Sequence, residues 1–169
     1  MAQICLFHRD FRTVDNLTLN LANKEGKTVY PIFIFDPRQV TAENKYRSPG
    51  AIGFMIEAIL DMKETIPELE LFYGLPERIL KHCKGDTVFH IADYTPFARR
   101  RNNEIKRVVG KCIEVHDAFL NPNIRRIEKK VFGAFHKDAM DHPVSEAKSK
   151  RGTYAKLTSI RPELRKYRA

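Results

Sequence analysis

The first 117 residues of the chain alternate short apolar runs with amphipathic segments. Five apolar runs predict strands. The first two lack the strict two-residue alternation of a half-solvated sheet, which is typical of strands buried on both faces. The five predicted strands span residues 4–7, 28–36, 69–74, 87–93 and 111–117.

Helical segments separate the predicted strands. The clearest covers residues 48–66, where Ser48 is a candidate N-cap, Pro49 suits a first turn and apolar residues recur at helical spacing. A short helix after the first strand has Asp15 or Asn16 available as its cap. That short helix is predicted over residues 15–26, and two further helices are predicted over residues 75–83 and 96–110. This alternation predicts an α/β fold, a Rossmann-like doubly wound sheet of five parallel strands in the order 3-2-1-4-5 with helices on both faces.

The alternation stops after residue 117, and the charge changes with it. Residues 1–120 contain 17 Lys and Arg against 16 Asp and Glu, whereas residues 121–169 contain 13 against 5, so the last segment supplies almost all of the net charge of +9. We predict one α/β domain over residues 1–143 and a basic tail over residues 144–169, partly extended or forming an added helix through Tyr154, Leu157, Ile160 and Leu164. Such a tail either attracts nucleic acid or an acidic partner, or is a solvated end.

Cysteine usage and hydropathy indicate the compartment. Cys5, Cys83 and Cys112 are an odd number without CxxC spacing, and each lies in or beside an apolar run. This predicts buried thiols in a reducing compartment and neither a disulfide framework nor a zinc site. The longest apolar stretches are too short for a membrane helix, and residues 1–7 lack the features of a signal peptide. We therefore expect an intracellular protein, in the cytoplasm or nucleus, with no membrane partner.

No standard catalytic motif is present. The sequence lacks GxGxxG, GxxxxGK[ST], GxSxG and HExxH, and its six histidines show no close pairing typical of metal ligands. Neither a catalytic residue nor a metal site is predicted.

Polar residues instead gather where four of the predicted strands end. The runs are HRDFR after the first strand, DPRQ after the second, ADYTPFARRR after the fourth and HDAFLNPN after the fifth. The carboxyl ends of parallel strands lie on one side of a sheet, and the first and fourth loops flank the point where the strand order reverses and a crevice opens. These residues either line a crevice for a planar polar ligand or only cap helices and pair with one another.

The stretch LFHRDFRTVDNLTL resembles the opening of the DNA photolyase/cryptochrome family, in which an apolar strand runs into a Phe-Arg-Arg-Asp-Leu-Arg-like turn, an Asp-Asn dipeptide and a leucine-rich helix. His8 and Phe11 depart from that turn. The matching residues are Arg9, Asp10, Arg12, Asp15 and Asn16. Three further stretches resemble the family in the same order: FIFDP, ADYTPFARRRN, and HDAFLNPN with KKVFGAFHKDAM. The resemblance extends over residues 4–143.

The resemblance implies a binding site for a light-harvesting antenna pigment, which relatives hold in the crevice of this domain. By analogy, the walls of the site come from Arg9, Asp10, Asp36, Arg47, Phe54, Asp93 and Tyr94. Arg47 would pair with a phosphate or phenolate of the pigment, because guanidinium forks bind such groups bidentately. Thr95 and Phe97 replace the acidic and amide residues of folate-binding members, which favours a deazaflavin or flavin pigment.

The resemblance also implies a larger protein, because family members join this domain to a helical domain that binds FAD and lesion DNA. We therefore expect the antenna-type part of a truncated or split DNA photolyase, a lyase for light-dependent repair of pyrimidine dimers. FAD is expected only in the helical half, which is the expected partner, and this chain alone is expected to be inactive. The basic tail would correspond to the start of the interdomain linker and bind DNA weakly and non-specifically. The alternatives are a cryptochrome-like sensory or ligand- or partner-binding module without enzymatic activity, and an inactive relic.

Overall fold

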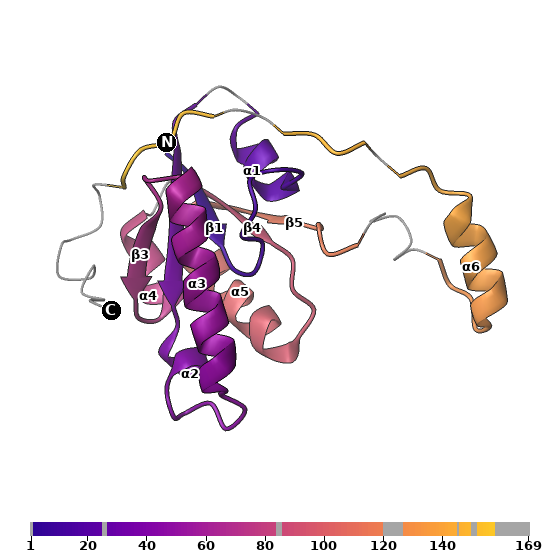
Figure 1. The fold of residues 1–169 in the computed structure, drawn as a ribbon, viewed down its shortest axis with the longest axis horizontal. Helices are drawn as coiled ribbons and strands as arrows, with labels where there is room; N and C mark the ends of the chain where they lie inside the picture. The colour runs from indigo at the N-terminus through magenta and orange to yellow at the C-terminus, as the bar shows by residue number, and fades with distance from the viewer. Residues whose placement is uncertain are drawn as a thin grey trace.

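Five parallel strands form one sheet at the centre of the computed structural model, which describes residues 2–24, 27–83, 86–119, 127–144, 146–149 and 152–157. The strands are β1 (Gln3–Phe7), β2 (Val29–Phe35), β3 (Glu70–Tyr73), β4 (Thr87–Ile91) and β5 (Lys111–Val115). Their order is β3-β2-β1-β4-β5 (Figure 1). Leu6 in β1 lies between Ile32 in β2 and His90 in β4. The predicted fold and strand order are confirmed.

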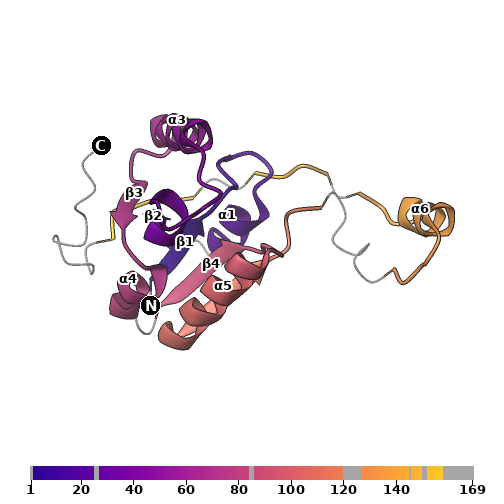
Figure 2. The ribbon, with the colours of Figure 1, turned by 90° about the horizontal axis from the view of Figure 1, so that it is seen from below.

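Helices cover both faces of the sheet. They are α1 (Leu17–Ala22), α2 (Pro37–Val40), α3 (Pro49–Thr65), α4 (Pro76–Leu80), η1 (Lys81–Cys83), α5 (Pro96–Val108) and α6 (Phe132–Met140). Cys5 and Phe7 pack with residues of α1 and α3, whereas Ile4 and Leu6 pack with residues of α4 and α5. Because successive side chains of a strand point to opposite faces, the continuous apolar run of β1 serves both layers, which Figure 2 shows from below. In the described part of the chain, no helix is both long and apolar enough to span a bilayer.

Two helices begin at the predicted caps. The Ser48 side chain accepts a hydrogen bond from the Ala51 amide, and Pro49 occupies the first turn of α3. Asn16, one of the two candidates, accepts from the Leu19 amide at the start of α1. Each side chain therefore satisfies an amide that has no partner within its own helix.

The sequence prediction was wrong about Cys112 and about the ends of three strands, since β4 ends at Ile91 and β5 at Val115 rather than at Asp93 and Asp117. Cys112 was expected to be buried, but it is partly exposed because β5 is an edge strand. Its remaining burial still raises the pKa of the thiol to about 11. The predicted second strand extended to Asp36, which instead caps the short helix α2 with its carboxylate. An Asp-Pro pair favours this start, since Pro fits the first helical turn.

The described residues of the basic tail return to the α/β domain. The chain leaves α6, which lies apart from the domain, and passes α1 toward the amino ends of the strands (Figure 1). There the Val29 amide donates to the Thr153 carbonyl and the Ala155 amide donates to the Val29 carbonyl, at 2.9 and 3.1 Å. Leu157 is buried and its amide donates to the Glu70 carboxylate. Residues 152–157 are thus extended, one of the two predicted forms, while Ile160 and Leu164 lie outside the described residues.

Candidate ligand-binding site

A cavity of about 390 Å³ opens beyond the carboxyl ends of β1, β2 and β4. Its walls come from the first loop, the end of β2, α2, the following residues 41–48, α3, the loop after β4 and α5. Five of the seven predicted site residues line it: Arg9, Asp36, Arg47, Phe54 and Asp93. The strand order brings these distant segments together, since parallel strands end on the same side.

The carboxylates of the cavity wall are already engaged. The buried Asp36 carboxylate accepts three hydrogen bonds from the Arg38 guanidinium, Nε to Oδ1 at 2.9 Å, Nε to Oδ2 at 3.1 Å and Nη2 to Oδ2 at 2.6 Å. Asp93 accepts from the Thr95 amide at 3.0 Å and lies 3.7 Å from the guanidinium of Arg9. Arg47 is exposed at the rim. These carboxylates therefore fix the shape of the site rather than offer free negative charge to a ligand.

Asp10 and Tyr94 do not line this cavity. The Asp10 side chain is buried, and its Oδ1 accepts a hydrogen bond from the His8 amide at 3.1 Å. Burial raises the pKa of Asp10. The Tyr94 hydroxyl lies 2.8 Å from Nδ1 of His116, and the two rings stack with centroids 5.9 Å apart. The structure thus uses both residues in packing and hydrogen bonds beside the cavity.

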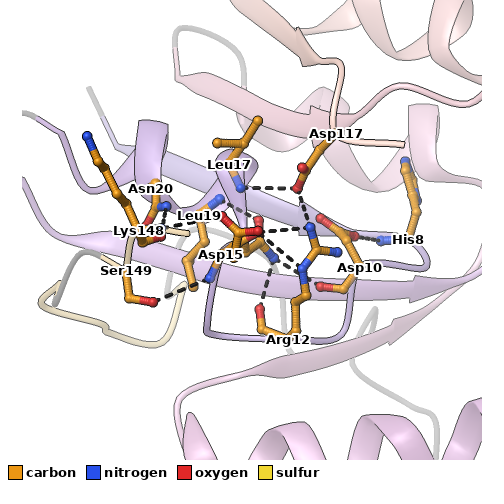
Figure 3. A network of polar contacts seen from close by, with 11 residues as sticks. His8, Asp10, Arg12, Asp15, Leu17, Leu19, Asn20, Asp117, Lys148 and Ser149 are labelled. Atoms are coloured by element: carbon orange, nitrogen blue, oxygen red, sulfur yellow. Dashed lines mark hydrogen bonds and ion pairs between the residues drawn. The ribbon is translucent and has the colours of Figure 1, made fainter. Parts of the chain in front are cut away.

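The charged first loop is held by its own hydrogen bonds, shown in Figure 3. The buried Asn16 amide group donates to the carbonyls of Asp10 and Arg12, each at 3.0 Å. Arg12 donates to the Asp15 carbonyl and pairs with Asp117 beyond β5 at 2.7 Å. Many of these charged residues therefore cap a helix or pair with one another, as one of the two interpretations of the loop predicted. The network also fixes the backbone that places His8 and Arg9 in the cavity wall.

Aromatic side chains form much of the remaining lining. Tyr46 and Phe54 lie at the mouth and are 96% and 74% exposed. Phe11 and Phe33 lie deeper, with ring centroids 5.4 Å apart. Exposed aromatic rings beside arginines provide flat apolar and cationic surfaces, a combination that suits a planar, partly anionic ligand.

His8 and Arg101 also line the cavity, and neither was among the predicted site residues. The sequence held a signal for Arg101, because it shares one face of α5 with the buried Ala98 and Ile105 at helical spacing. A charged residue on an apolar stripe is unusual unless it has a partner or a ligand. Within the part of the chain that the structure describes, no group of three or more His, Cys, Asp or Glu is placed to hold a metal ion.

Comparisons with known proteins agree on one family. The family model for DNA photolyase matches residues 3–156. Relatives in sequence include the (6-4)DNA photolyase of Arabidopsis thaliana, 28% identical over 88 residues, and a cryptochrome DASH of Xenopus laevis, 28% identical over 86 residues. Each match covers 46% of this chain and 16% of the relative.

Solved structures show the same fold. An archaeal photolyase from Sulfolobus tokodaii is 30% identical with a TM-score of 0.85, over 95% of this chain and 40% of that one. It was solved with two FAD molecules, with the implication of a novel light-harvesting cofactor. A cryptochrome of Synechocystis sp. PCC6803, 17% identical, has a TM-score of 0.81 over 96% of this chain and 38% of that one. This chain thus spans less than half of these proteins.

Proposed function

Because the chain belongs to the DNA photolyase/cryptochrome family and corresponds to its N-terminal α/β domain, we propose that its cavity binds a flavin-type antenna pigment, a deazaflavin or a flavin. The observation that carries this proposal is the cavity at the carboxyl edge of the sheet, lined by aromatic rings and arginines. Its volume of about 390 Å³ is in the range of small-molecule sites, which run from roughly 300 to 1,000 Å³.

The residues of the cavity fit a flavin ring. Phe11, Phe33 and Phe54 offer apolar surface for a planar heterocycle, while Arg9 and Arg47 offer guanidinium groups to its polar edge or phosphate. The 30% identical archaeal photolyase was solved with two FAD molecules, more than a single catalytic flavin requires, which supports a flavin in the antenna role.

The proposal extends to the whole protein, whose repair chemistry requires a helical half that holds FAD and the lesion. The antenna pigment, when bound, absorbs light and passes excitation energy to that FAD. This chain holds and orients the pigment, excludes water from its buried side and presents it to the helical half. The activity is then that of a deoxyribodipyrimidine photolyase, a lyase acting in DNA repair.

Pigment binding is tested by titrating the purified chain with FMN, FAD and an 8-hydroxy-5-deazaflavin and following pigment fluorescence. Ala58 lines the cavity, so Ala58→Trp should fill it and abolish binding. Leu60→Trp is the matched control, because Leu60 lies on the same helix, is 55% exposed and is outside the cavity lining. Absence of binding by the unaltered chain, or equal binding by both variants, contradicts the proposal.

The partner is tested by a repair assay with a cyclobutane-dimer oligonucleotide under blue light. The 169-residue chain with added FAD should leave the dimer intact, since electron transfer requires flavin and flipped-out lesion in contact. Addition of an FAD-loaded helical half should give repair, and pigment in the α/β domain should raise its light efficiency. Dimer loss with the chain and FAD alone contradicts the proposed division of labour.

A cryptochrome-like sensory module is the second candidate, favoured by the match to cryptochrome DASH. It predicts pigment binding without dimer repair when the helical half is present, so the same assay separates the two functions. Weak DNA binding by the basic tail remains a proposal for either. Its affinity for duplex DNA should be sequence-independent and fall steeply with salt through counterion release.

A further inference from the structure

Arg101 is a buried cation without a charged partner. The residue is 5% exposed, and its Nε and Nη2 both donate to the neutral side-chain oxygen of Asn102 at 3.2 Å. Within the described part of the chain no carboxylate forms an ion pair with it, and Arg101 is one of the residues that line the cavity. Buried charges in proteins are normally paired, because an unpaired charge loses its hydration without compensation.

The surrounding charges do not compensate this burial. Asp93 and Asp36 attract the Arg101 cation, but Arg9 and Arg38, which pair with those carboxylates, repel it. Burial is the largest influence and lowers the pKa of Arg101 to about 10, so the group still carries its charge at neutral pH. The Phe97 ring, whose centroid lies 5.8 Å from Cζ of Arg101, adds a cation–π contact. The buried charge nevertheless has no direct ion pair within the described residues.

A second polar atom of the same cavity lacks a partner. Nε2 of His8 is buried and makes no hydrogen bond, and His8 lines the cavity. Burial, followed by the charge of Arg101, lowers the pKa of His8 well below its ordinary value. The neutral ring can donate or accept one hydrogen bond without adding charge. The residues that line this cavity thus include Arg101, which has no ion pair, and His8, whose Nε2 has no hydrogen bond, within the described structure.

We propose that Arg101 and His8 form an anion-binding subsite in the cavity, which receives an anionic oxygen of the bound ligand. Arg101 supplies the charge and the hydrogen-bond fork, and His8 orients the same oxygen through Nε2. The identity of the ligand as a flavin-type pigment rests on the proposed function, whereas the anion preference rests on these two residues. The oxygen belongs either to a phosphate or to an ionised ring hydroxyl.

The test compares Arg101→Gln with Arg100→Gln, an exposed arginine on the same helix. Three probes separate the sources: riboflavin, which has neither group; FMN, which adds a phosphate; and 8-hydroxy-5-deazariboflavin, which adds an acidic ring hydroxyl. A charge-assisted contact predicts that Arg101→Gln weakens the favoured anionic probe about ten- to hundred-fold. Riboflavin affinity should change by less than about threefold, and Arg100→Gln should leave the three affinities unchanged. Arg101→Lys should recover part of the loss.

A measurement without pigment makes the two proposals separable. Inorganic phosphate, compared with chloride at equal ionic strength, should raise the melting temperature of the unaltered chain and of Arg100→Gln but not of Arg101→Gln. If phosphate protects in this way and no flavin binds, the proposed function fails and the anion subsite stands. If flavins bind but Arg101→Gln affects the three probes equally or not at all, and phosphate protection is the same in both variants, the subsite is overturned and the proposed function stands. If neither flavin nor phosphate binds, both are overturned.

Discussion

The two ends of the parallel strands, called here the amino edge and the carboxyl edge, differ in the contacts of one prominent group each: the tail hydrogen-bonds to β2 and β3 at the amino edge, and a buried arginine without an ion pair among the described residues lies at the carboxyl edge. At the amino edge, residues 152–157 continue the hydrogen bonding of β2 through Val29, and the Leu157 amide donates to Glu70. Here the Tyr154 hydroxyl also accepts from Asn23 at 3.2 Å. At the carboxyl edge, Arg101 has no ion-pair partner and Nε2 of His8 has no hydrogen bond in the described structure.

On the proposed function, the amino ends of the strands stabilise the fold and the carboxyl ends bind the ligand. The hydrogen bonds of the tail to β2 and the burial of Leu157 contribute to the stability of the folded domain. Unsatisfied polar groups cost folding free energy and persist where a ligand completes them. Substitutions at the amino edge should therefore destabilise the domain, whereas the removal of an uncompensated group at the carboxyl edge should not.

The largest effect is expected at the amino edge, from Leu157→Ala. Leu157 is 3% exposed and packs with the β1, β2 and α4 residues of one core layer, so truncation should lower the free energy of unfolding by about 3 kcal/mol. Urea unfolding measures the change. Val144→Ala, at a 53% exposed position, is the control and should alter stability by less than about 0.5 kcal/mol. Equal effects from both variants would show that the tail does not seal this edge.

The second-largest effect is expected in the first loop, where Asn16→Ala should lower the free energy of unfolding by about 2 kcal/mol. Asn16→Ala removes the cap of α1 and both hydrogen bonds to the carbonyls of the loop, leaving buried backbone groups unsatisfied. Thermal and urea unfolding should detect the loss. Val14 lies in the same loop and is 64% exposed, so Val14→Ala should leave the free energy of unfolding nearly unchanged. A neutral Asn16→Ala would mean that the hydrogen bonds in Figure 3 do not hold the cavity wall.

Acidic pH should lower the free energy of unfolding of the domain through the two buried histidines His8 and His90. Burial lowers the pKa of both His8 and His90, so the folded protein keeps these rings neutral while the unfolded chain takes up protons. Their contribution to stability is complete above the ordinary histidine value near 6.5 and is lost below it, by at most about 1.4 kcal/mol per pH unit for each ring. Urea unfolding between pH 7.5 and 5 measures the slope.

The matched control for this pH dependence is His136→Gln, on an exposed part of α6. It should keep the slope of the unaltered chain, whereas His8→Gln with His90→Gln should flatten it. Identical slopes in all three proteins would remove the buried histidines as the cause.

The smallest predicted effect has the opposite sign. Arg101→Met replaces a buried unpaired charge with an apolar chain of similar length, and should raise the free energy of unfolding of the ligand-free domain by about 1 kcal/mol. Arg100→Met should change it by less than about 0.5 kcal/mol, because Arg100 is exposed. If Arg101→Met instead lowered the free energy of unfolding by several kcal/mol, Arg101 would be a stabilising residue and the two ends of the strands would not differ as described.

Sequence by itself determined the architecture, because its signals are local. The period of apolar residues distinguishes strands from helices, and side chains such as Ser48 and Asn16 satisfy amides three residues away. The rule that parallel strands end together was enough to gather five of the seven predicted site residues around one cavity. It did not distinguish residues that face the cavity from Asp10 and Tyr94, which turn to partners beside it.

Only the tertiary structure decided which polar groups are satisfied. Arg101 lies on an apolar stripe in the sequence, but whether a carboxylate meets it depends on which segments fold against α5. The same holds for the tail, where Leu157 reaches β3 across 87 residues of chain to seal the amino edge. Such pairings depend on contacts between distant segments, and local periodicity carries no information about them. The physical reason is that a buried polar group is stabilised or destabilised by its neighbours in space, which the fold alone supplies.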